Sequence, residues 1–345
     1  MSIPIENIYY LLCYAWDKLD EKDQVKISVD DSTEIIDLFA KILINGTRKL
    51  LKRGVEKSYI TVTEELAGLK GKLEISPTLK TGLYLKQRTI CSFDEFSSDI
   101  LSNQILFTTL SRLIRTNGLN SDLKRQIKSL TWMLPGISTI ELNHHVFSQI
   151  RVHRNNRFYE FLLKVCQIIY ENTLPSEKPG EWLFEDFMRD NNKMNKLYEA
   201  FLFNFYKREH PKWTVRKEYI YWQFGTPVYS HRDFLPRMET DITIENEQGK
   251  IIIDAKYYQE TLKAKFDHEK VYSSNLYQLY SYLMNQRSTD PVSYQTRGIL
   301  IYPTIENEVD LDYWYDQHHI QIKTVNLNMN WKLIEERLKD IVEHV

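Results

Sequence analysis

The two strands predicted at 237–246 and 250–258 constrain the fold of this chain more than any other segment. The apolar residues of the first strand alternate with polar ones, and the second strand begins with three consecutive isoleucines. A four-residue loop at 246–249 joins them, which is typical of an antiparallel hairpin. The segment therefore predicts a two-stranded antiparallel hairpin.

The register of this hairpin predicts a pair of facing carboxylates. Pairing Glu245 with Lys250 across the loop places Asp241 directly opposite Asp254. Two facing carboxylates repel each other by about 0.2–1 kcal/mol in a bare antiparallel pair. A divalent cation bound between them removes this repulsion, and oxygen ligands with few histidines suit Mg²⁺, with Mn²⁺ as a substitute, rather than zinc.

Lys256 follows Asp254 by two residues, so the two side chains share one face of the strand. A metal ion beside an ammonium group is the set that phosphodiester hydrolysis needs. The metal polarises the scissile phosphate and activates a water molecule, and the lysine orients that water and offsets charge. The alternative is a surface hairpin with a salt bridge between Glu239 and Lys256. The hairpin residues alone do not decide between the two interpretations.

The helices predicted on either side of the hairpin add candidate residues. Glu199 lies among apolar residues of the first helix, where it is either a third metal ligand or an ordinary exposed position. Gln278 and Tyr282 are four residues apart in the second helix, so they share one face. They either hold the substrate backbone or support Lys256, or they belong to a tyrosine-rich packing face.

The rest of the chain predicts two domains. Two prolines and a glycine at 174–180 mark a linker between an N-terminal domain, 1–174, and a C-terminal domain, 175–345. The C-terminal pattern is a mixed sheet flanked by helices, so the fold class is α/β, or α+β overall. Helices are predicted at 7–19, 33–53, 98–116, 121–133, 155–173, 192–209, 269–286 and 330–343, and strands between 59 and 93 and at 215–223, 297–303 and 318–325.

Composition limits the possible partners and compartment. The 345 residues carry a net charge of −2, so any nucleic-acid partner must be held by a local patch, by metal ions or by a second subunit. Three widely spaced cysteines favour a reducing compartment, and no apolar run is long enough for a membrane helix. With no basic stretch at the N-terminus, we expect a cytoplasmic protein without membrane contact. The absence of a G-x-x-x-x-G-K-[ST] motif predicts that the chain itself binds no nucleotide.

Charge is unevenly distributed in the N-terminal half. Residues 1–40 hold nine acids and three bases, whereas residues 41–72 hold eight bases and three acids. Short strands with glycine breaks can project as a finger, so charged residues there either contact a partner or are simply solvated. The candidates for partner contact are Lys70, Lys72, Asp94 and Glu95. A basic run suited to DNA or to a solvated helix end comprises Lys207, Arg208, Lys212, Arg216 and Lys217.

The motifs taken together resemble a known family. Glu199, Asp241, Asp254-x-Lys256 and Gln278-x-x-x-Tyr282 resemble the core of the PD-(D/E)xK nucleases in their RecB-like form. More narrowly, the chain is similar to the McrC family of nuclease subunits from modified-cytosine restriction systems. The segments that carry this resemblance are 7–12, 14–16, 68–72, 93–94 with Asn103, 134–138, 235–244, 254–258 and 275–279.

The resemblance implies a restriction-endonuclease-like domain that cuts DNA with Mg²⁺. It also implies an McrB-type AAA+ GTPase partner, whose GTP hydrolysis this chain stimulates and which reads the modified cytosine. Asp241, Asp254 and Lys256 match the family pattern, whereas the family does not always place a glutamate at Glu199. A double-strand break needs two active sites, so we expect two copies in the working complex. The alternatives are a non-catalytic activator or scaffold on a nuclease-like fold and a stand-alone nuclease.

Overall fold

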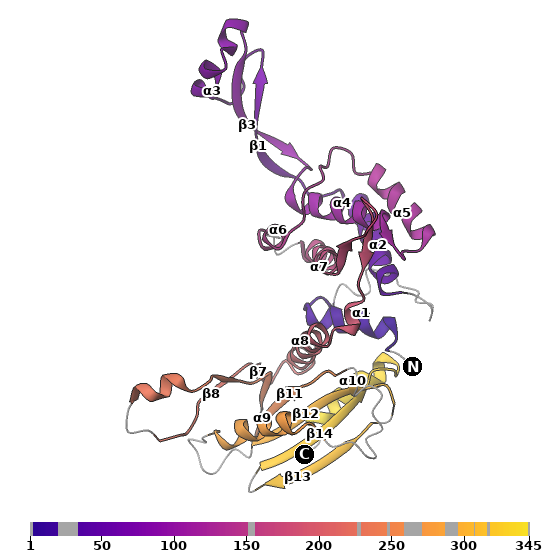
Figure 1. Ribbon diagram of the computed structural model, residues 1–345, viewed down its shortest axis with the longest axis vertical. Coiled ribbons are helices and arrows are strands. Elements are labelled where there is room, and N and C mark those ends of the chain that lie inside the picture. The colour runs from indigo at the N-terminus through magenta and orange to yellow at the C-terminus, as the bar shows by residue number, and fades with distance from the viewer. Residues whose placement is uncertain are drawn as a thin grey trace. The chain divides into compact units, whose positions relative to one another are not determined.

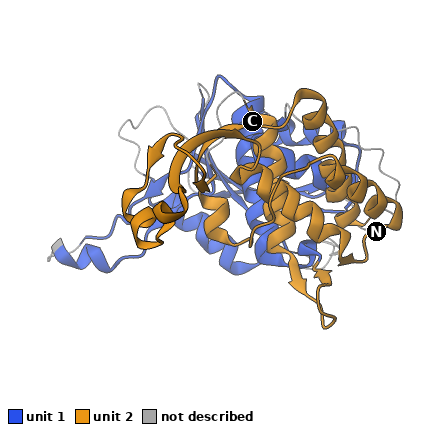
Figure 2. Cartoon of the chain, turned by 90° about the horizontal axis from the view of Figure 1, so that it is seen from above, with its two compact units in different colours: residues 1–24, 28–33, 186–345 blue, residues 25–27, 34–185 orange. Residues whose placement is uncertain are grey.

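The chain divides into two compact units (Figure 2). Unit 1 contains residues 1–24, 28–33 and 186–345, and unit 2 contains residues 25–27 and 34–185. The structure is a computed structural model, and no helix in its described part is both long and apolar enough to cross a membrane. The described residues are 3–19, 34–150, 156–225, 229–246, 249–258, 271–286, 296–306, 308–315 and 318–343.

A mixed sheet forms the centre of unit 1, as the strand pattern predicts. Its strand order is β13-β14-β12-β11-β10-β7 (Figure 1). β11, β12 and β14 run parallel to one another, whereas β7, β10 and β13 pair antiparallel with their neighbours. The strands are β7 (Thr214–Arg216), β10 (Ile242–Asn246), β11 (Gly249–Ala255), β12 (Thr296–Thr304), β13 (Asp310–Tyr315) and β14 (His318–Asn326).

Helices cover both faces of this sheet. The helix α9 (Ser273–Met284) packs against Ile252, Leu300 and Ile322 on one face. Gly298 of β12 permits this approach, because a Cβ atom there would lie 2.8 Å from a methyl carbon of Leu283. The other face is covered by α8 (Asn191–Glu209) and α10 (Trp331–Glu343), which are joined by a hydrogen bond from the Tyr206 hydroxyl to the Leu338 carbonyl.

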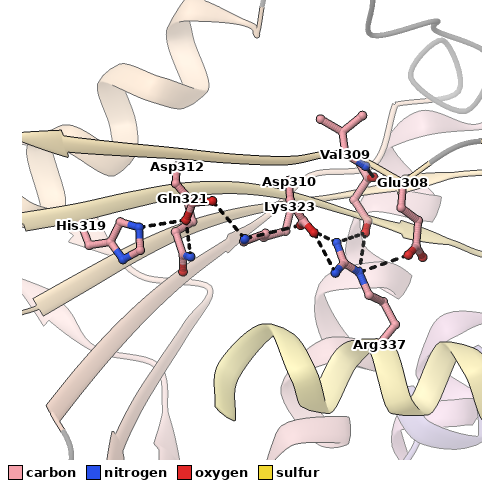
Figure 3. Close-up of polar contacts among 9 residues, drawn as sticks. Glu308, Val309, Asp310, Asp312, His319, Gln321, Lys323 and Arg337 are labelled. Atoms are coloured by element: carbon pink, nitrogen blue, oxygen red, sulfur yellow. Dashed lines mark hydrogen bonds and ion pairs between the residues drawn. The ribbon is translucent and has the colours of Figure 1, made fainter. Parts of the chain in front are cut away.

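The edge strand β13 was not predicted from the sequence. Its side chains alternate in the usual way, so Leu311 packs toward the α9 face while Asp310 and Asp312 point to the other. The charged face is a network of ion pairs and hydrogen bonds (Figure 3). In this network Asp310 binds Arg337 and Lys323, and Asp312 binds His319, Gln321 and Lys323.

The first helix belongs to unit 1, so the predicted N-terminal domain of residues 1–174 is wrong at its beginning. In α1 (Ile5–Ala15), the Asn7 side-chain amide donates to the carbonyls of Leu327 and Met329, each at 2.8 Å. The ring of Tyr10 stacks on Trp331 at 4.5 Å. These partners are more than 300 residues away in the sequence, so local periodicity could not reveal them.

The predicted linker at 174–180 is also wrong, because these residues lie inside unit 2. The segment forms the turn between β5 (Thr173–Pro175) and β6 (Trp182–Phe184), which pair antiparallel. The Ser176 amide donates to the Glu181 carbonyl at 2.9 Å and helps to close the turn. Proline and glycine therefore mark a hairpin here, and the division between the units falls at residues 185 and 186.

Unit 2 combines a helical body with a ribbon of strands. The ribbon consists of β1 (Ser58–Leu66), β2 (Lys72–Leu73) and β3 (Thr89–Ser97), in the order β1-β3-β2. Strands were expected at 69–75 and 83–93, and β2 and β3 occupy part of these ranges. Ile75, however, begins α3 (Ile75–Lys80), and residues 83–86 form the short 3₁₀ helix η2 (Leu83–Lys86) (Figure 1). The helical body contains α2 (Ile35–Arg53), α4 (Leu101–Ile114), α5 (Ser121–Trp132), α6 (His144–Ser148) and α7 (Arg157–Glu171), with β4 (Thr116–Asn117) beside β6.

Candidate active site

The predicted hairpin exists, and its register is the predicted one. Glu245 pairs with Lys250, and the ladder runs from Ile242 opposite Ile253 to Asn246 opposite Gly249. Asn246 and Gly249 belong to the ladder, so the loop is shorter than the four residues predicted. Ile252 and Ile253 are fully buried, so the alternative of a surface hairpin is wrong.

The first strand of the hairpin breaks just before the predicted carboxylate pair. Its leading part is a separate strand, β9 (Met238–Glu239), which pairs with β8 (Tyr219–Ile220). Between β9 and β10 lies buried Thr240, whose amide donates to the Glu218 carbonyl and whose hydroxyl accepts from the Glu218 amide, each at 3.0 Å. Glu239 therefore lies opposite Tyr219, and the predicted pairing of Glu239 with Lys256 is wrong.

The break nevertheless leaves the predicted catalytic residues together. Asp241 lies just beyond the ladder, and one of its carboxylate oxygens accepts a hydrogen bond from the Ala255 amide at 2.9 Å. The Lys256 ammonium lies 3.0 Å from an Asp254 oxygen and 4.0 Å from an Asp241 oxygen. Asp254 is fully buried, and the side chains of Asp241 and Lys256 are only 17% and 13% exposed. The sequence prediction that these three side chains form one cluster is confirmed.

The electrostatics of this cluster are those of crowded buried charges. Burial, reinforced by the negative charge of Asp241, raises the pKa of Asp254 to about 7. Burial also raises the pKa of Asp241, against the lowering effect of Lys256. For Lys256, burial favours the neutral form, but the two aspartates outweigh it and raise its pKa. The lysine therefore stays charged, and it offsets only part of the repulsion between the two acids.

Glu199 is near this cluster but is bound to another residue. Its carboxylate forms an ion pair and hydrogen bond with the ammonium of Lys217. Its negative charge contributes to the raised pKa of Asp241. Within the described residues, no three His, Cys, Asp or Glu side chains have the spacing of a metal site. The structure thus brings Asp241 and Asp254 together, whereas the third predicted ligand points to Lys217.

Gln278 and Tyr282 lie beside the cluster on α9, on one face as predicted. The Gln278 amide donates to the Tyr282 hydroxyl at 2.7 Å, and that hydroxyl donates to the Glu239 carbonyl at 2.8 Å. The charges of Asp254 and Asp241 contribute, after burial, to raising the pKa of Tyr282 to about 12. The pair therefore fixes β9 where the chain turns toward Asp241.

Several supporting residues were missed in the sequence. Asn195 of α8 accepts a hydrogen bond from the Tyr257 amide at 2.8 Å, immediately after Lys256. On the face of the sheet that α9 covers, the Asn275 side chain donates to the Tyr302 hydroxyl at 2.9 Å and accepts from the Tyr258 hydroxyl at 3.2 Å. An asparagine or tyrosine within a helix or strand carries no distinctive pattern, so only the fold reveals these contacts.

The basic run predicted as a possible DNA contact is partly neutralised. Arg216 donates two hydrogen bonds to Glu245, at 2.8 and 2.7 Å, and Lys217 pairs with Glu199. Arg216 therefore joins two neighbouring strands of the sheet, and Lys217 pairs with an acid near the carboxylate cluster. The remaining residues of the run stay candidates for DNA contact.

The predicted partner-contact residues lie on the ribbon of unit 2, and all of them are exposed. The ammonium of Lys70 lies 3.6 Å from the centre of the Phe93 ring, and Lys72 pairs with Glu74 at 3.3 Å. Asp94 accepts a hydrogen bond from the Thr61 hydroxyl at 2.9 Å. Glu95 lies opposite Ile60 in the β1–β3 ladder. Their role in binding a partner stays a prediction.

Comparison with known proteins identifies the family to which the chain belongs. The family profile described as "McrBC 5-methylcytosine restriction system component" matches residues 6–303. The chain belongs to this family. It is 36% identical over 342 residues to the Escherichia coli (strain K12) protein described as "Type IV methyl-directed restriction enzyme EcoKMcrBC", covering 99% of this chain and 97% of the relative. The family resemblance predicted from the motifs is confirmed.

A solved structure supports the fold. The chain is similar to one from the half-complex of a tetradecameric assembly of Thermococcus gammatolerans McrB AAA+ hexamers with bound McrC. The TM-score is 0.58 at 16% identity, with 98% of this chain and 76% of the other covered. At this identity the match concerns the fold alone, and it agrees with the predicted mixture of helices and sheets.

Proposed function

We propose that this chain is the DNA endonuclease subunit of a modified-cytosine restriction complex. The observation that carries the proposal is the cluster of Asp241, buried Asp254 and Lys256 in a member of the McrBC family. Burying two acids beside one lysine is costly for a protein that needs them only for stability. Perturbed acids of this kind are typical of a functional site.

The two aspartates fit a divalent cation. One Asp254 oxygen is buried and has no hydrogen-bond partner among the described residues, while the other contacts Lys256. Carboxylate oxygens without histidine or cysteine suit Mg²⁺ or Mn²⁺. A cation bound there would polarise the scissile phosphodiester and lower the pKa of the attacking water. Asp241 and Asp254 would hold it, and Glu199 is the candidate for a third ligand.

The residues around the aspartates have separate roles in this proposal. Lys256 places a positive charge beside Asp254, where it orients the attacking water and stabilises negative charge that develops on the phosphate oxygens. Gln278 and Tyr282 act as positioning residues, because Tyr282 binds the Glu239 carbonyl and Gln278 binds the Tyr282 hydroxyl, rather than the carboxylates. Asn195 positions Lys256 in the same sense through the Tyr257 amide.

We further propose that the chain works with an McrB-type AAA+ GTPase. The E. coli relative is described as McrBC, and the Thermococcus gammatolerans structure contains McrB AAA+ hexamers with bound McrC. In this proposal the chain stimulates GTP hydrolysis by the partner and cuts DNA only in the complex. The partner reads the modified cytosine, and two copies of the chain supply the two cuts of a double-strand break. The exposed ribbon of unit 2 is the candidate surface for the GTPase.

One experiment separates this function from its alternatives. Plasmid DNA with methylated cytosines is incubated with the purified chain and Mg²⁺, with and without the GTPase partner and GTP. We expect cleavage only when all components are present. Stimulated GTP hydrolysis without cleavage under every condition would instead support the non-catalytic activator. Cleavage by the chain alone would support a stand-alone nuclease.

A further inference from the structure

Lys217 is a second positively charged residue at the candidate active site. It lies between β7 and β8, in a segment that its neighbours hold in place. Arg216 is bound to Glu245 by two hydrogen bonds, and the Glu218 backbone is bound to Thr240 in both directions. Lys217 reaches instead to Glu199 on α8.

The charges of Lys217 and the carboxylates act on one another. Burial favours the neutral form of Lys217, but the hydrogen bond and charge of Glu199, followed by the charges of Asp241 and Glu239, raise its pKa. Glu199 in turn adds to the raised pKa of Asp241. The charge of Glu199 therefore interacts both with the Lys217 ammonium and with the Asp241 carboxylate.

The two lysines of the site differ in how firmly they are held. Lys256 contacts two aspartates and its side chain is 13% exposed, so moving it would leave a buried acid without its partner. Lys217 has its ion pair with Glu199 alone among the described residues, and its side chain is 46% exposed. An exposed ammonium can be transferred to water or to a phosphate at little cost.

We propose that Lys217 is the counter-ion that a divalent cation must displace from Glu199, and that the displaced ammonium then binds a phosphate of the DNA substrate. The inference rests on the proposed nuclease function. While Glu199 binds Lys217, its carboxylate is a poor ligand, because its charge is already neutralised. Once it turns to the cation, Lys217 is free at the edge of the site where the negatively charged backbone must pass.

The first test measures Mn²⁺ binding to the full chain without DNA, by titration calorimetry. The variants are Lys217→Met, Glu199→Gln and the double variant, with Lys332→Met on α10 as a control for the loss of one exposed lysine. We expect Lys217→Met to bind Mn²⁺ about tenfold more tightly, the scale on which contacts to metal ligands act. Glu199→Gln should bind more weakly, and adding Lys217→Met to it should change nothing. Lys217→Gln serves as a second variant should the methionine impair folding.

The results distinguish this inference from the proposed function. Suppose that the wild type binds Mn²⁺. If Lys217→Met does not change the affinity, or raises it equally in the Glu199→Gln background, the inference is overturned and the proposed function is not. A wild type that binds no Mn²⁺ would overturn both.

The second test measures binding of the full chain to a short DNA duplex at a series of low salt concentrations, with Ca²⁺ to prevent cleavage. With Ca²⁺ present, the slope of log affinity against log salt should fall by about one in Lys217→Met, the value for one lost phosphate contact. With a chelator in place of Ca²⁺, the slopes of variant and wild type should be equal. Equal slopes in Ca²⁺ would overturn the role of Lys217 in holding phosphate.

Discussion

The two units each carry an antiparallel pair of strands, and the pairs differ in what surrounds them. In unit 1, β10 and β11 are buried between helices, and Asp254 has no exposed surface. In unit 2, β1 and β3 pair over nine residues from Ser58–Ser97 to Leu66–Thr89, yet half of their eighteen side chains are exposed and only Cys91 and Phe93 are buried. Tyr59 and Phe96 of this ribbon are 72% and 57% exposed.

This difference indicates two kinds of function. A charged group in a buried hairpin interacts strongly with its neighbours, so it can hold a metal ion or change its pKa. A charged or aromatic group on an exposed ribbon interacts weakly with its own chain, and its free surface suits contact with another protein. We therefore propose catalysis for the β10–β11 hairpin and partner contact for the β1–β3 ribbon. The following predictions test this assignment.

The largest effect is expected for Asp254→Asn. Cleavage in the complex should fall by about a thousandfold, because the proposed metal ligand is lost and a single group at an active site can contribute that much to the rate. Stimulation of the partner's GTPase should stay at the wild-type level, since Asp254 lies in unit 1. Both activities are measured on one preparation, and Asp312→Asn on the opposite face of the sheet is the control. Loss of GTPase stimulation with an intact fold would contradict the separation of roles.

Lys256→Met is expected to reduce the cleavage rate without weakening metal binding. The lost stabilisation of the transition state is about 2.7–4 kcal/mol, or about a hundred- to a thousandfold in rate. A cation beside the metal repels it, so removing the lysine should not loosen the metal. The check is a titration of Mg²⁺ against cleavage rate. Full rescue by excess Mg²⁺ would show that Lys256 has a structural role instead.

A smaller effect is expected on the ribbon. Replacing Lys70, Lys72, Asp94 and Glu95 together by alanine should weaken GTPase stimulation about tenfold, the effect of losing one good interface contact. These residues are exposed, so thermal unfolding should not change. Lys164→Ala on the helical body of unit 2 is the control. Unchanged stimulation at limiting concentrations of the chain would place the activating surface elsewhere.

The smallest effect concerns stability and pH. With a chelator present, folded Asp254 keeps its proton up to about pH 7, whereas the unfolded chain loses it near pH 3.8. Wild-type stability should therefore fall as the pH rises through this window. Asp254→Asn cannot ionise, so its melting temperature should equal the wild-type value near pH 4 and exceed it by a few degrees at pH 8. If the difference in melting temperature between the two proteins stayed constant across this range, the pKa of Asp254 would not be raised in the folded protein.

The sequence by itself determined the parts of this protein that depend on local order. The spacing of apolar residues predicted the major helices, such as α2, α7 and α8, because one helical face must be buried. The loop position set the hairpin register, because strand pairing propagates residue by residue from the turn. That register was enough to bring Asp241, Asp254 and Lys256 to one place.

Only the tertiary structure decided the contacts between distant segments. It assigned α1 to unit 1 through Asn7 and Trp331, and it made the predicted linker a turn inside unit 2. It also turned the chain at Thr240 and placed Lys217 against Glu199. The reason in each case is that a hydrogen bond or ion pair depends on which residues the fold brings together. The sequence around one partner does not indicate which distant residue the other partner is.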